Sequence, residues 1–350
     1  MAQRLKIAVT GTGTIVERAH LPGLASDSGV AIFLCGRNSN RLSELSSRFP
    51  IEQTFSSFEE CLQSMSLDGT IIATPNFLHG EDAFKAISHG LPILLEKPVA
   101  HDIAAAREIA ARAGQAGVPV HLNLPQPLRP SMQLIKAAIA DDRFGQIRSI
   151  DVAMLRHAAI PGFGTWFTQK RLSGGGVLAD YGPHMLDLAL HLAGDYRAKL
   201  ISAKIWSDLG PKGQGLGDWA AHRNVDDPAA QFDVEDRALL HLETAAGTLI
   251  TCEVAWAYRG ANESRVRLVG DLGGCEYRSD TGDGPVLIMF PSSPLPCAPD
   301  HDCLDGPWHL VIKRWLESLR VGERADGLSK GMAVAEIIAQ AYEVCCRDER

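Results

Sequence analysis

A lysine that follows a short apolar run is the first residue of this chain placed to do chemistry. Segment 91–98 reads LPILLEKP, and its run over 93–95 predicts a short strand buried on both faces, because the run is continuous and bounded by prolines. Glu96 and Lys97 then leave the carboxyl end of that strand. In an open α/β sheet ligands bind at this edge, so Lys97 stands where a catalytic charge is useful. The alternative is a solvated loop pair.

The first turn of the chain is rich in glycine. It lies between a strand expected at 5–10 and a helix expected at 16–25, and it comprises Gly11, Thr12, Gly13, Thr14 and Ile15. The two glycines let the backbone turn tightly and approach a pyrophosphate, toward which the helix N-terminus would point. Val16 replaces the third glycine of the usual pattern, but the strand, turn and helix order still favours dinucleotide binding over a purely structural turn.

The end of the strand expected at 30–35 indicates which dinucleotide is bound. An NAD-binding protein usually has an acid there, whereas this chain has Gly36, Arg37 and Asn38, with Arg41 one turn later. Arginine can bind a 2′-phosphate that a carboxylate would repel, and one charge-assisted hydrogen bond contributes about 1.5–3 kcal/mol. The sequence therefore favours NADP over NAD. If Arg37 only stacks on the adenine, both cofactors would bind.

A third polar segment follows the strand expected at 70–73. Its members Thr74, Pro75, Asn76 and His79 would lie at the same sheet edge as Lys97 and are predicted to contact the cofactor together with Glu96. The alternative is that Asn76 and His79 are ordinary helix caps.

These motifs belong to a regular alternation of strands and helices. We expect strands at 5–10, 30–35, 53–55, 70–73, 93–95 and 118–122, and helices at 16–25, 40–48, 57–65, 78–89 and 102–116. Short links between them predict a doubly wound parallel sheet, a Rossmann domain at 1–122.

The remaining residues, 123–350, are predicted to form a second domain. We expect helices at 130–140, 307–320 and 329–346 and strands at 147–155, 199–206, 234–243, 247–256, 264–269, 273–278 and 286–290. Short turns between successive strands predict an α+β domain with a mostly antiparallel sheet and helices on one face. The polar stretch 208–232, which contains Trp219, is expected to be a lid or a disordered segment.

Composition limits the class of protein. The chain has 350 residues, of which 45% are hydrophobic and 22% charged, and a net charge of −8 argues against nucleic acid or an anionic membrane as partner. Its eight cysteines form no CxxC pair, and several lie inside apolar runs, as free buried thiols do. With no signal-peptide core and no bilayer-spanning stretch, we expect a soluble cytoplasmic protein.

Four segments together resemble the glucose-fructose oxidoreductase/inositol dehydrogenase family, Gfo/Idh/MocA. They are GTGTIVERAHLP at 11–22, ATPNFLHGEDAFKAISHGLPILLEKP at 73–98, GGGVLADYGPHMLDL at 174–188 and VED at 234–236. The resemblance implies a Rossmann domain that holds a nicotinamide cofactor and a C-terminal domain whose sheet often forms the interface of a homodimer or homotetramer. The substrate is expected to bind between the two domains.

The resemblance also implies oxidation of a secondary alcohol of a sugar, cyclitol or related polyol, or reduction of the matching ketone. It places Lys97, Asp180 and His184 at catalytic positions. The residue types suit this chemistry, because hydride leaves a carbinol carbon only as the hydroxyl proton is lost, and histidine is a base of suitable pKa. Protonated Lys97 would stabilise the developing alkoxide, and Asp180 would orient the imidazole or bind a substrate hydroxyl.

Three further residues are predicted to contact the substrate: Asn123, Trp166 and Lys170, although Trp166 could equally be a packing residue. The stretch 123–130, NLPQPLRP, departs from the Asn-x-Arg pattern of many relatives, so the substrate class does not transfer through it.

Asp180, His184, Asp187 and His191 recur at spacings that could describe a metal site on a helix. No further ligand cluster accompanies them and the family chemistry is metal-free, so no metal is predicted. Asp187 is expected to be structural, and His191 an ordinary core or surface residue.

The sequence therefore predicts an NADP-preferring oxidoreductase. A cofactor-sensing regulator of the same fold would be expected to lose Lys97 or His184, and both are present. A glycoside-cleaving relative that oxidises its substrate transiently remains the alternative.

Overall fold

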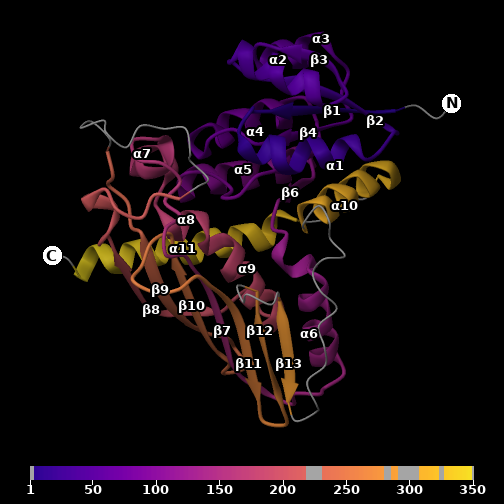
Figure 1. Ribbon diagram of the computed structural model, residues 1–350. Helices are drawn as coiled ribbons and strands as arrows, with labels where there is room; N and C mark the ends of the chain where they lie inside the picture. The colour runs from indigo at the N-terminus through magenta and orange to yellow at the C-terminus, as the bar shows by residue number, and fades with distance from the viewer. Residues whose placement is uncertain (1–3, 218–230, 280–284, 291–306, 323–326, 349–350) are drawn as a thin grey trace. The chain divides into compact units, whose positions relative to one another are not determined.

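The computed structural model describes residues 4–217, 231–279, 285–290, 307–322 and 327–348 (Figure 1). The chain divides into two compact units. The first comprises Met1–Pro125 and Cys303–Met332, and the second comprises Gln126–Asp302 and Ala333–Arg350.

The first unit is built on a six-stranded sheet in which every neighbouring pair is parallel. Its spatial order is β3 (Ile51–Phe55), β2 (Val30–Cys35), β1 (Leu5–Thr10), β4 (Gly69–Ile72), β5 (Ile93–Leu95) and β6 (Val120–Leu122). The order reverses direction between β1 and β4, and ligands bind at such a switch point in doubly wound sheets. The predicted Rossmann architecture is confirmed.

Helices cover both faces of this sheet, which is why its central strands are mostly apolar, whereas the edge strand β3 is largely exposed. On β1, Ile7 and Val9 pack into one core while Ala8 packs into the other. The helices within residues 1–125 are α1 (Leu21–Ala25), α2 (Ser39–Arg48), α3 (Phe58–Ser64), α4 (His79–Ser88) and α5 (Ile103–Ala116). The helix expected at 16–25 is divided into the π-helix η1 (Val16–His20) and α1, with Pro22 in the first turn of α1.

The helix α10 (Pro307–Val321) belongs to the first unit, although the sequence placed it in the second domain. Its buried face contributes Ile312, Trp315 and Leu316 to the core beneath β1 and β4. It lies beside α1 (Figure 1), and Trp315 packs so closely on Gly69 that a Cβ there would lie 2.9 Å from the indole. The expected domain 123–350 is therefore not a single unit, because this apolar helix face completes the N-terminal core.

The second unit contains a seven-stranded sheet that is antiparallel except for the parallel pair β7 and β10. Its order is β13 (Val286–Phe290), β12 (Gly274–Arg278), β11 (Glu263–Gly270), β7 (Ile147–Leu155), β10 (Leu249–Ala255), β9 (Arg237–Glu243) and β8 (Lys199–Trp206). This arrangement confirms the predicted α+β fold of the second domain.

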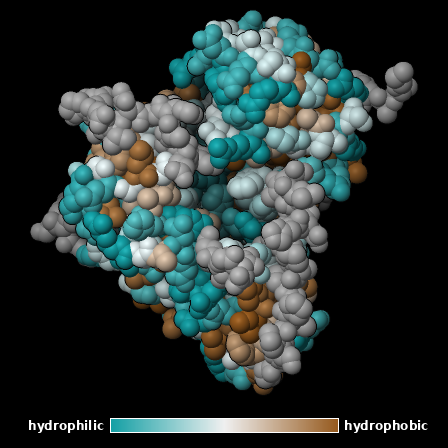
Figure 2. Space-filling view, in the orientation of Figure 1, coloured by the Kyte–Doolittle hydropathy of each residue, from teal (hydrophilic) through white to brown (hydrophobic). Residues whose placement is uncertain are grey.

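One face of the second sheet is covered by helices. α6 (Pro130–Ala140), α9 (Gly182–Ala193) and the later part of α11 (Leu328–Asp348) share a core with its buried residues. Alternate residues of β9 show the two faces, since Leu240 is buried and His241 is exposed. On the outer face, apolar residues gather over β12 and β13 (Figure 2), where Val286 and Phe290 are exposed.

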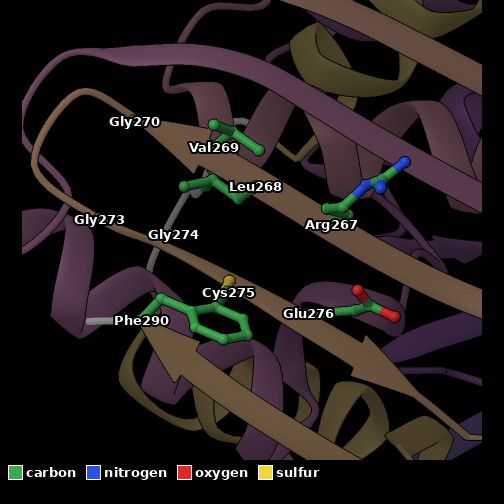
Figure 3. Close-up of a pocket in the computed structure, with 9 residues that line it drawn as sticks. All are labelled: Arg267, Leu268, Val269, Gly270, Gly273, Gly274, Cys275, Glu276 and Phe290. Atoms are coloured by element: carbon green, nitrogen blue, oxygen red, sulfur yellow. The ribbon is translucent and has the colours of Figure 1, made fainter. Parts of the chain in front are cut away.

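A shallow hollow lies on this second sheet at β11, β12 and the end of β13 (Figure 3). It is lined by Arg267, Leu268, Val269, Gly270, Gly273, Gly274, Cys275, Glu276 and Phe290. None of the residues predicted to be catalytic or to bind cofactor or substrate is among them.

The packing of α10 generates a test of the domain organisation. Trp315→Ala should lower the free energy of unfolding by about 3–5 kcal/mol, because a buried aromatic side chain leaves a cavity. Val321→Ala on the same helix is the control, since Val321 is 74% exposed. Hydrogen exchange should show that the tryptophan variant loses protection in β1 and β4. Loss confined to β7 and β10 would contradict the assignment of α10 to the first unit.

Candidate active site

The glycine turn after β1 is required by a close approach of backbone. Gly11 has φ +102°, and a Cβ at this position would lie 2.5 Å from the carbonyl oxygen of Ala73, at the end of β4. Its N–H donates to the carbonyl of Cys35, at the end of β2. A Cβ at Gly13, in contrast, would meet open space. The turn is therefore fixed at Gly11 and open at Gly13, as a phosphate-binding turn requires.

The polar residues after β2 divide into one exposed arginine and two residues with local partners. Arg37 is exposed. The Asn38 side chain accepts from Arg41 N–H at 3.1 Å and caps α2. The Arg41 guanidinium lies 2.6 Å from Glu17 and 2.7 Å from Glu44, and it also donates to the Thr12 carbonyl.

This ion pair lowers the pKa of Glu17, through hydrogen bonds from Arg41 and then from Arg48. Arg41 thus ties α2 to the glycine turn, and of the two predicted phosphate-binding arginines Arg37 is the more accessible.

The segment after β4 is held by buried side chains. His79 is 1% exposed, and its ring nitrogens lie 2.9 Å from the carbonyl oxygens of Thr74 and Pro98. Burial lowers the pKa of His79, and the two carbonyls offset this only in part. The Thr74 hydroxyl donates to buried Asp82 at 2.8 Å, while Asn76 is buried at the start of η2 (Asn76–Leu78). His79 therefore connects this segment to the loop that carries Lys97.

Glu96 is a buried carboxylate held by donors from three segments. Its Oε1 lies 2.8 Å from His20 Nε2 and 2.6 Å from Asn123 Nδ2, and its Oε2 accepts from the Lys97 N–H at 3.2 Å. Burial acts to raise the pKa of Glu96. The hydrogen bond and charge of His20, the Asn123 amide and the charge of Lys97 outweigh burial and lower the pKa to about 2. Glu96 is consequently ionised at neutral pH.

These contacts describe the surroundings of Lys97 and Asn123. Lys97 is the second residue after β5, is half-buried, and precedes Pro98 through a cis peptide bond. Asn123, which the sequence predicts to bind substrate, is 1% exposed and donates to Glu96. Lys97 thus emerges at the predicted sheet edge, and Asn123 supports the carboxylate beside it.

In the second unit, the glycine triplet lies where neighbouring atoms leave no room for a side chain. A Cβ at Gly175 would lie 1.8 Å from the Tyr342 hydroxyl, and one at Gly176 would lie 2.0 Å from the Glu235 carbonyl. Glu235 is 5% exposed, and its Oε1 accepts from the N–H groups of Gly176 and Leu178 at 2.9 Å and from the Tyr342 hydroxyl at 2.8 Å.

The carboxylates of Glu235 and Asp236 both accept hydrogen bonds from backbone N–H groups at the start of a helix. Glu235 caps α8 (Val177–Asp180), and Asp236 accepts from the backbone N–H groups of residues 208–210. The strand β9 begins at Arg237, three residues later than the sequence suggested.

Asp180 and His184 flank the break between α8 and α9. Asp180 ends α8, and its Oδ2 accepts from Trp256 Nε1 at 2.8 Å. Trp256 is 1% exposed, so it holds the carboxylate from within the core. His184 is the third residue of α9 and is half-buried. The two helices are separated by Tyr181 alone, and Pro183 lies in the first turn of α9.

Of the other residues of the spacing pattern, Asp187 has a structural contact. Asp187 is 3% exposed, and its Oδ1 accepts from the Tyr196 hydroxyl at 2.7 Å. No cluster of three or more histidine, cysteine, aspartate or glutamate side chains that could hold a metal occurs among the residues described. Several cysteines are buried free thiols that form no disulfide. They are Cys35, Cys61, Cys252, Cys275 and Cys345.

The predicted substrate contacts Trp166 and Lys170 lie just before the glycine triplet, in η4 (Trp166–Thr168) and α7 (Lys170–Ser173). Trp166 stacks on Phe167 with ring centroids 3.8 Å apart, and the Lys170 ammonium lies 5.8 Å from the centre of the Tyr342 ring. Trp219 and most of the expected lid lie outside the described residues. Substrate binding by Trp166 and Lys170 stays a prediction.

Sequence reasoning missed several residues that hold these sites. His20 and Glu235 lie inside segments that carried the resemblance, but their partners are distant in the chain. Trp256 and Tyr342 carry no motif at all. A buried polar residue in an otherwise apolar pattern, such as His20, is the one signal that could have found such positions.

The fold and these two sets of residues define a class of protein: a dinucleotide-binding oxidoreductase with a second α+β domain. Comparison with known families agrees. Residues 5–124 match the model described as "Oxidoreductase family, NAD-binding Rossmann fold", and residues 132–276 match "GFO/IDH/MocA C-terminal domain". The chain belongs to the Gfo/Idh/MocA family, so the resemblance is confirmed. It is an enzyme of the NAD(P)-dependent dehydrogenase and reductase class.

Named relatives include sugar dehydrogenases. The chain is 25% identical over 276 residues to D-glucoside 3-dehydrogenase of Escherichia coli (strain K12), covering 77% of this chain and 76% of that protein. It is 26% identical over 228 residues to levoglucosan dehydrogenase of Pseudarthrobacter phenanthrenivorans, covering 64% of this chain and 58% of the relative.

Solved structures share the fold at low identity. Levoglucosan dehydrogenase in complex with NADH has a TM-score of 0.80 at 19% identity and covers 99% of this chain and 98% of that one. GenD2 from gentamicin A biosynthesis, in complex with NAD, has a TM-score of 0.79 at 24% identity, with 100% and 96% covered. None of the helices within the described residues combines the length and hydropathy that a membrane span requires.

The depressed pKa of Glu96 generates a pH-dependent prediction. Glu96→Gln should lower the free energy of unfolding at neutral pH by about 2–3 kcal/mol, because hydrogen bonds to a buried charged group are lost. The folded pKa lies below the ordinary 4.5, so the stabilisation is present above pH 4.5 and is lost as the pH falls toward 2.

Denaturation of wild type and variant across this pH range measures the difference in their free energies of unfolding. This difference should become smaller at acidic pH. Glu52→Gln is the control, since Glu52 pairs with Arg4 at the surface, where an ion pair contributes about 0–1 kcal/mol. A wild-type advantage that is equally large at neutral and acidic pH would contradict the ionised state of Glu96.

Proposed function

We propose that this enzyme transfers hydride between NADP(H) and a secondary alcohol or ketone of a sugar, cyclitol or related polyol. The observation that carries the proposal is the placement of Lys97 at the carboxyl end of β5 in an NAD-binding fold, beside an ionised carboxylate. In the second unit, Asp180 and His184 flank the start of α9. When bound, the nicotinamide supplies the hydride acceptor or donor.

Each proposed catalytic residue has a distinct task. His184 accepts the hydroxyl proton during oxidation and returns it during reduction. Protonated Lys97 stabilises negative charge on the reacting oxygen. Asp180, whose Oδ2 is held by Trp256, binds a substrate hydroxyl or orients the imidazole. The names of the relatives, a glucoside dehydrogenase and a levoglucosan dehydrogenase among them, support a sugar-like substrate.

The preference for NADP rests on Arg37. It is exposed after β2, and the position before it is Gly36, whose added Cβ would lie 2.6 Å from Thr12 Cγ2. No carboxylate side chain occupies residues 35–38 to repel a 2′-phosphate. Arg41 is already paired with Glu17 and Glu44, so Arg37 is the proposed phosphate ligand.

We also infer a homodimer or homotetramer that uses the second sheet. Its outer face exposes Leu249, Val269 and Phe290, of which Leu249 is 52% and Phe290 54% exposed. Apolar side chains on a sheet face favour association with a matching surface.

Turnover of sugars, cyclitols and their keto forms with each cofactor tests the reaction. Lys97→Ala and His184→Ala should each lower kcat by about 10²–10⁴, the usual contribution of a positioned proton-transfer or charge-stabilising group. Lys85→Ala, which removes an exposed ion pair with Glu81 on α4, is the control. Net change in NADPH absorbance separates a dehydrogenase from a glycoside-cleaving enzyme, which would show none. Substrate cleavage without a net change in NADPH absorbance would refute the dehydrogenase proposal.

Arg37→Asp tests the cofactor preference separately. The substitution should shift relative affinity from NADPH toward NADH by at least about tenfold, because one charge-assisted hydrogen bond to phosphate is lost and repulsion is added. Fluorescence titration with both cofactors measures the ratio. Arg112→Asp on α5, which should leave the ratio unchanged, controls for net charge. If the ratio in the Arg37 variant equals that of wild type, Arg37 does not bind the phosphate.

A further inference from the structure

We propose that His20 is a positioning residue for Lys97 and acts through the Glu96 carboxylate. The inference deepens the proposed function, on which it rests, because it names a residue outside the predicted catalytic set that keeps Lys97 in its working orientation. His20 ends η1, the helix that follows the glycine turn. It therefore joins the predicted phosphate-binding segment to the predicted catalytic lysine.

His20 occupies a place where an apolar residue would be expected. Its exposed fraction is 0%, and its neighbours in sequence, Ala19 and Leu21, are buried in the same way. Burying a polar ring is costly unless it is hydrogen-bonded, and Nε2 makes its bond to Glu96 at 2.8 Å. Nδ1 has no hydrogen-bond partner among the residues described. The ring is thus oriented by Glu96, and the site retains a histidine at a cost in desolvation.

Two hydrogen bonds, both made by the Glu96 carboxylate, connect His20 to the backbone of Lys97. His20 and Asn123 both bond to Oε1 of Glu96, so they fix the plane of the carboxylate. The other oxygen, Oε2, accepts from the backbone N–H of Lys97 at 3.2 Å. If His20 is removed, the carboxylate keeps one side-chain donor and can rotate about its Cγ–Cδ bond. Rotation changes the acceptor that holds the Lys97 backbone.

A second contact, which does not involve Glu96, holds the residue that follows Lys97. His79 contacts the Pro98 carbonyl at 2.9 Å, so the residue after Lys97 is held independently of Glu96. A change at His20 therefore releases the contact made through Glu96 and should reorient Lys97 without unfolding the loop. A purely structural role for His20 predicts instead a loss of stability with no specific effect on Lys97.

Two substitutions separate these roles. His20→Leu keeps similar volume and removes the donor, whereas His20→Gln places an amide nitrogen near the position of Nε2. The leucine variant should lower kcat by at least about tenfold, with the NADPH dissociation constant changed less than about threefold, as expected when one hydrogen bond to a charged group is lost. The glutamine variant should recover kcat to within about threefold of wild type by the same reasoning.

A measurement without substrate reports on Lys97 directly. Reductive ¹³C-methylation labels the lysines, and the Lys97 resonance is assigned by its absence in Lys97→Arg. In His20→Leu this resonance should move toward the position of free methyl-lysine, and in His20→Gln it should stay at the wild-type position. An unmoved resonance in the leucine variant, or an equal displacement in both variants, overturns the inference. If His20→Leu does not fold, Glu96→Gln decides, since an unmoved Lys97 resonance there overturns it too.

The two readouts keep the two proposals apart. If the wild type turns over no sugar, cyclitol or keto form while the resonance responds as expected, the proposed function fails and the positioning role stands. If the wild type is active and Lys97→Ala is not, but His20→Leu leaves both kcat and the resonance unchanged, the positioning role fails alone.

Discussion

The segments that carry the candidate catalytic residues of both units are held by buried carboxylates that bind backbone N–H groups. In the first unit, Glu96 accepts from the N–H of Lys97, and in the second, Glu235 accepts from the N–H groups of Gly176 and Leu178. A buried carboxylate is stable only when its oxygens are hydrogen-bonded, so it determines the position of the chain that supplies the donors. The first of these segments contains Lys97, and the second continues into α8, which ends at Asp180.

The two carboxylates differ in how their surroundings affect ionisation. Glu96 has a histidine, an amide and a lysine charge nearby, and its pKa falls to about 2. Burial raises the pKa of Glu235, against hydrogen bonds from a tyrosine hydroxyl and backbone amides. Cationic partners stabilise the charged form far more than neutral donors do. The first unit thus keeps a permanent negative charge beside the lysine, while the second uses its carboxyl group as a helix cap.

Close backbone approach explains why both motifs need glycine. Gly11 lies against the Ala73 carbonyl and Gly176 against the Glu235 carbonyl, at distances that exclude a Cβ. A side chain at either position would force the neighbouring backbone to move, so both turns depend on glycine. Shared fold alone says little about substrate, which depends on the individual side chains of the site.

Much of the fold could be predicted from local pattern. The alternation of apolar strands with helices defined the parallel sheet, and the position of Lys97 followed from the length of its apolar run, because these signals lie within a few neighbouring residues. The same reasoning identified the glycine turn after β1. The individual roles of the candidate site residues were inferred from type and spacing, and they stay predictions.

Only the tertiary structure shows which distant residues hold the candidate site residues in position. His20 meets Glu96 across 76 positions of chain, Trp256 meets Asp180 across another 76, and α10 returns to the N-terminal core from beyond residue 300. Contacts of this kind leave no periodic trace in a sequence, since each partner obeys only the pattern of its own helix or strand. Local spacing therefore determined where the candidate site residues lie in the chain's elements, and packing between distant segments determined how they are held.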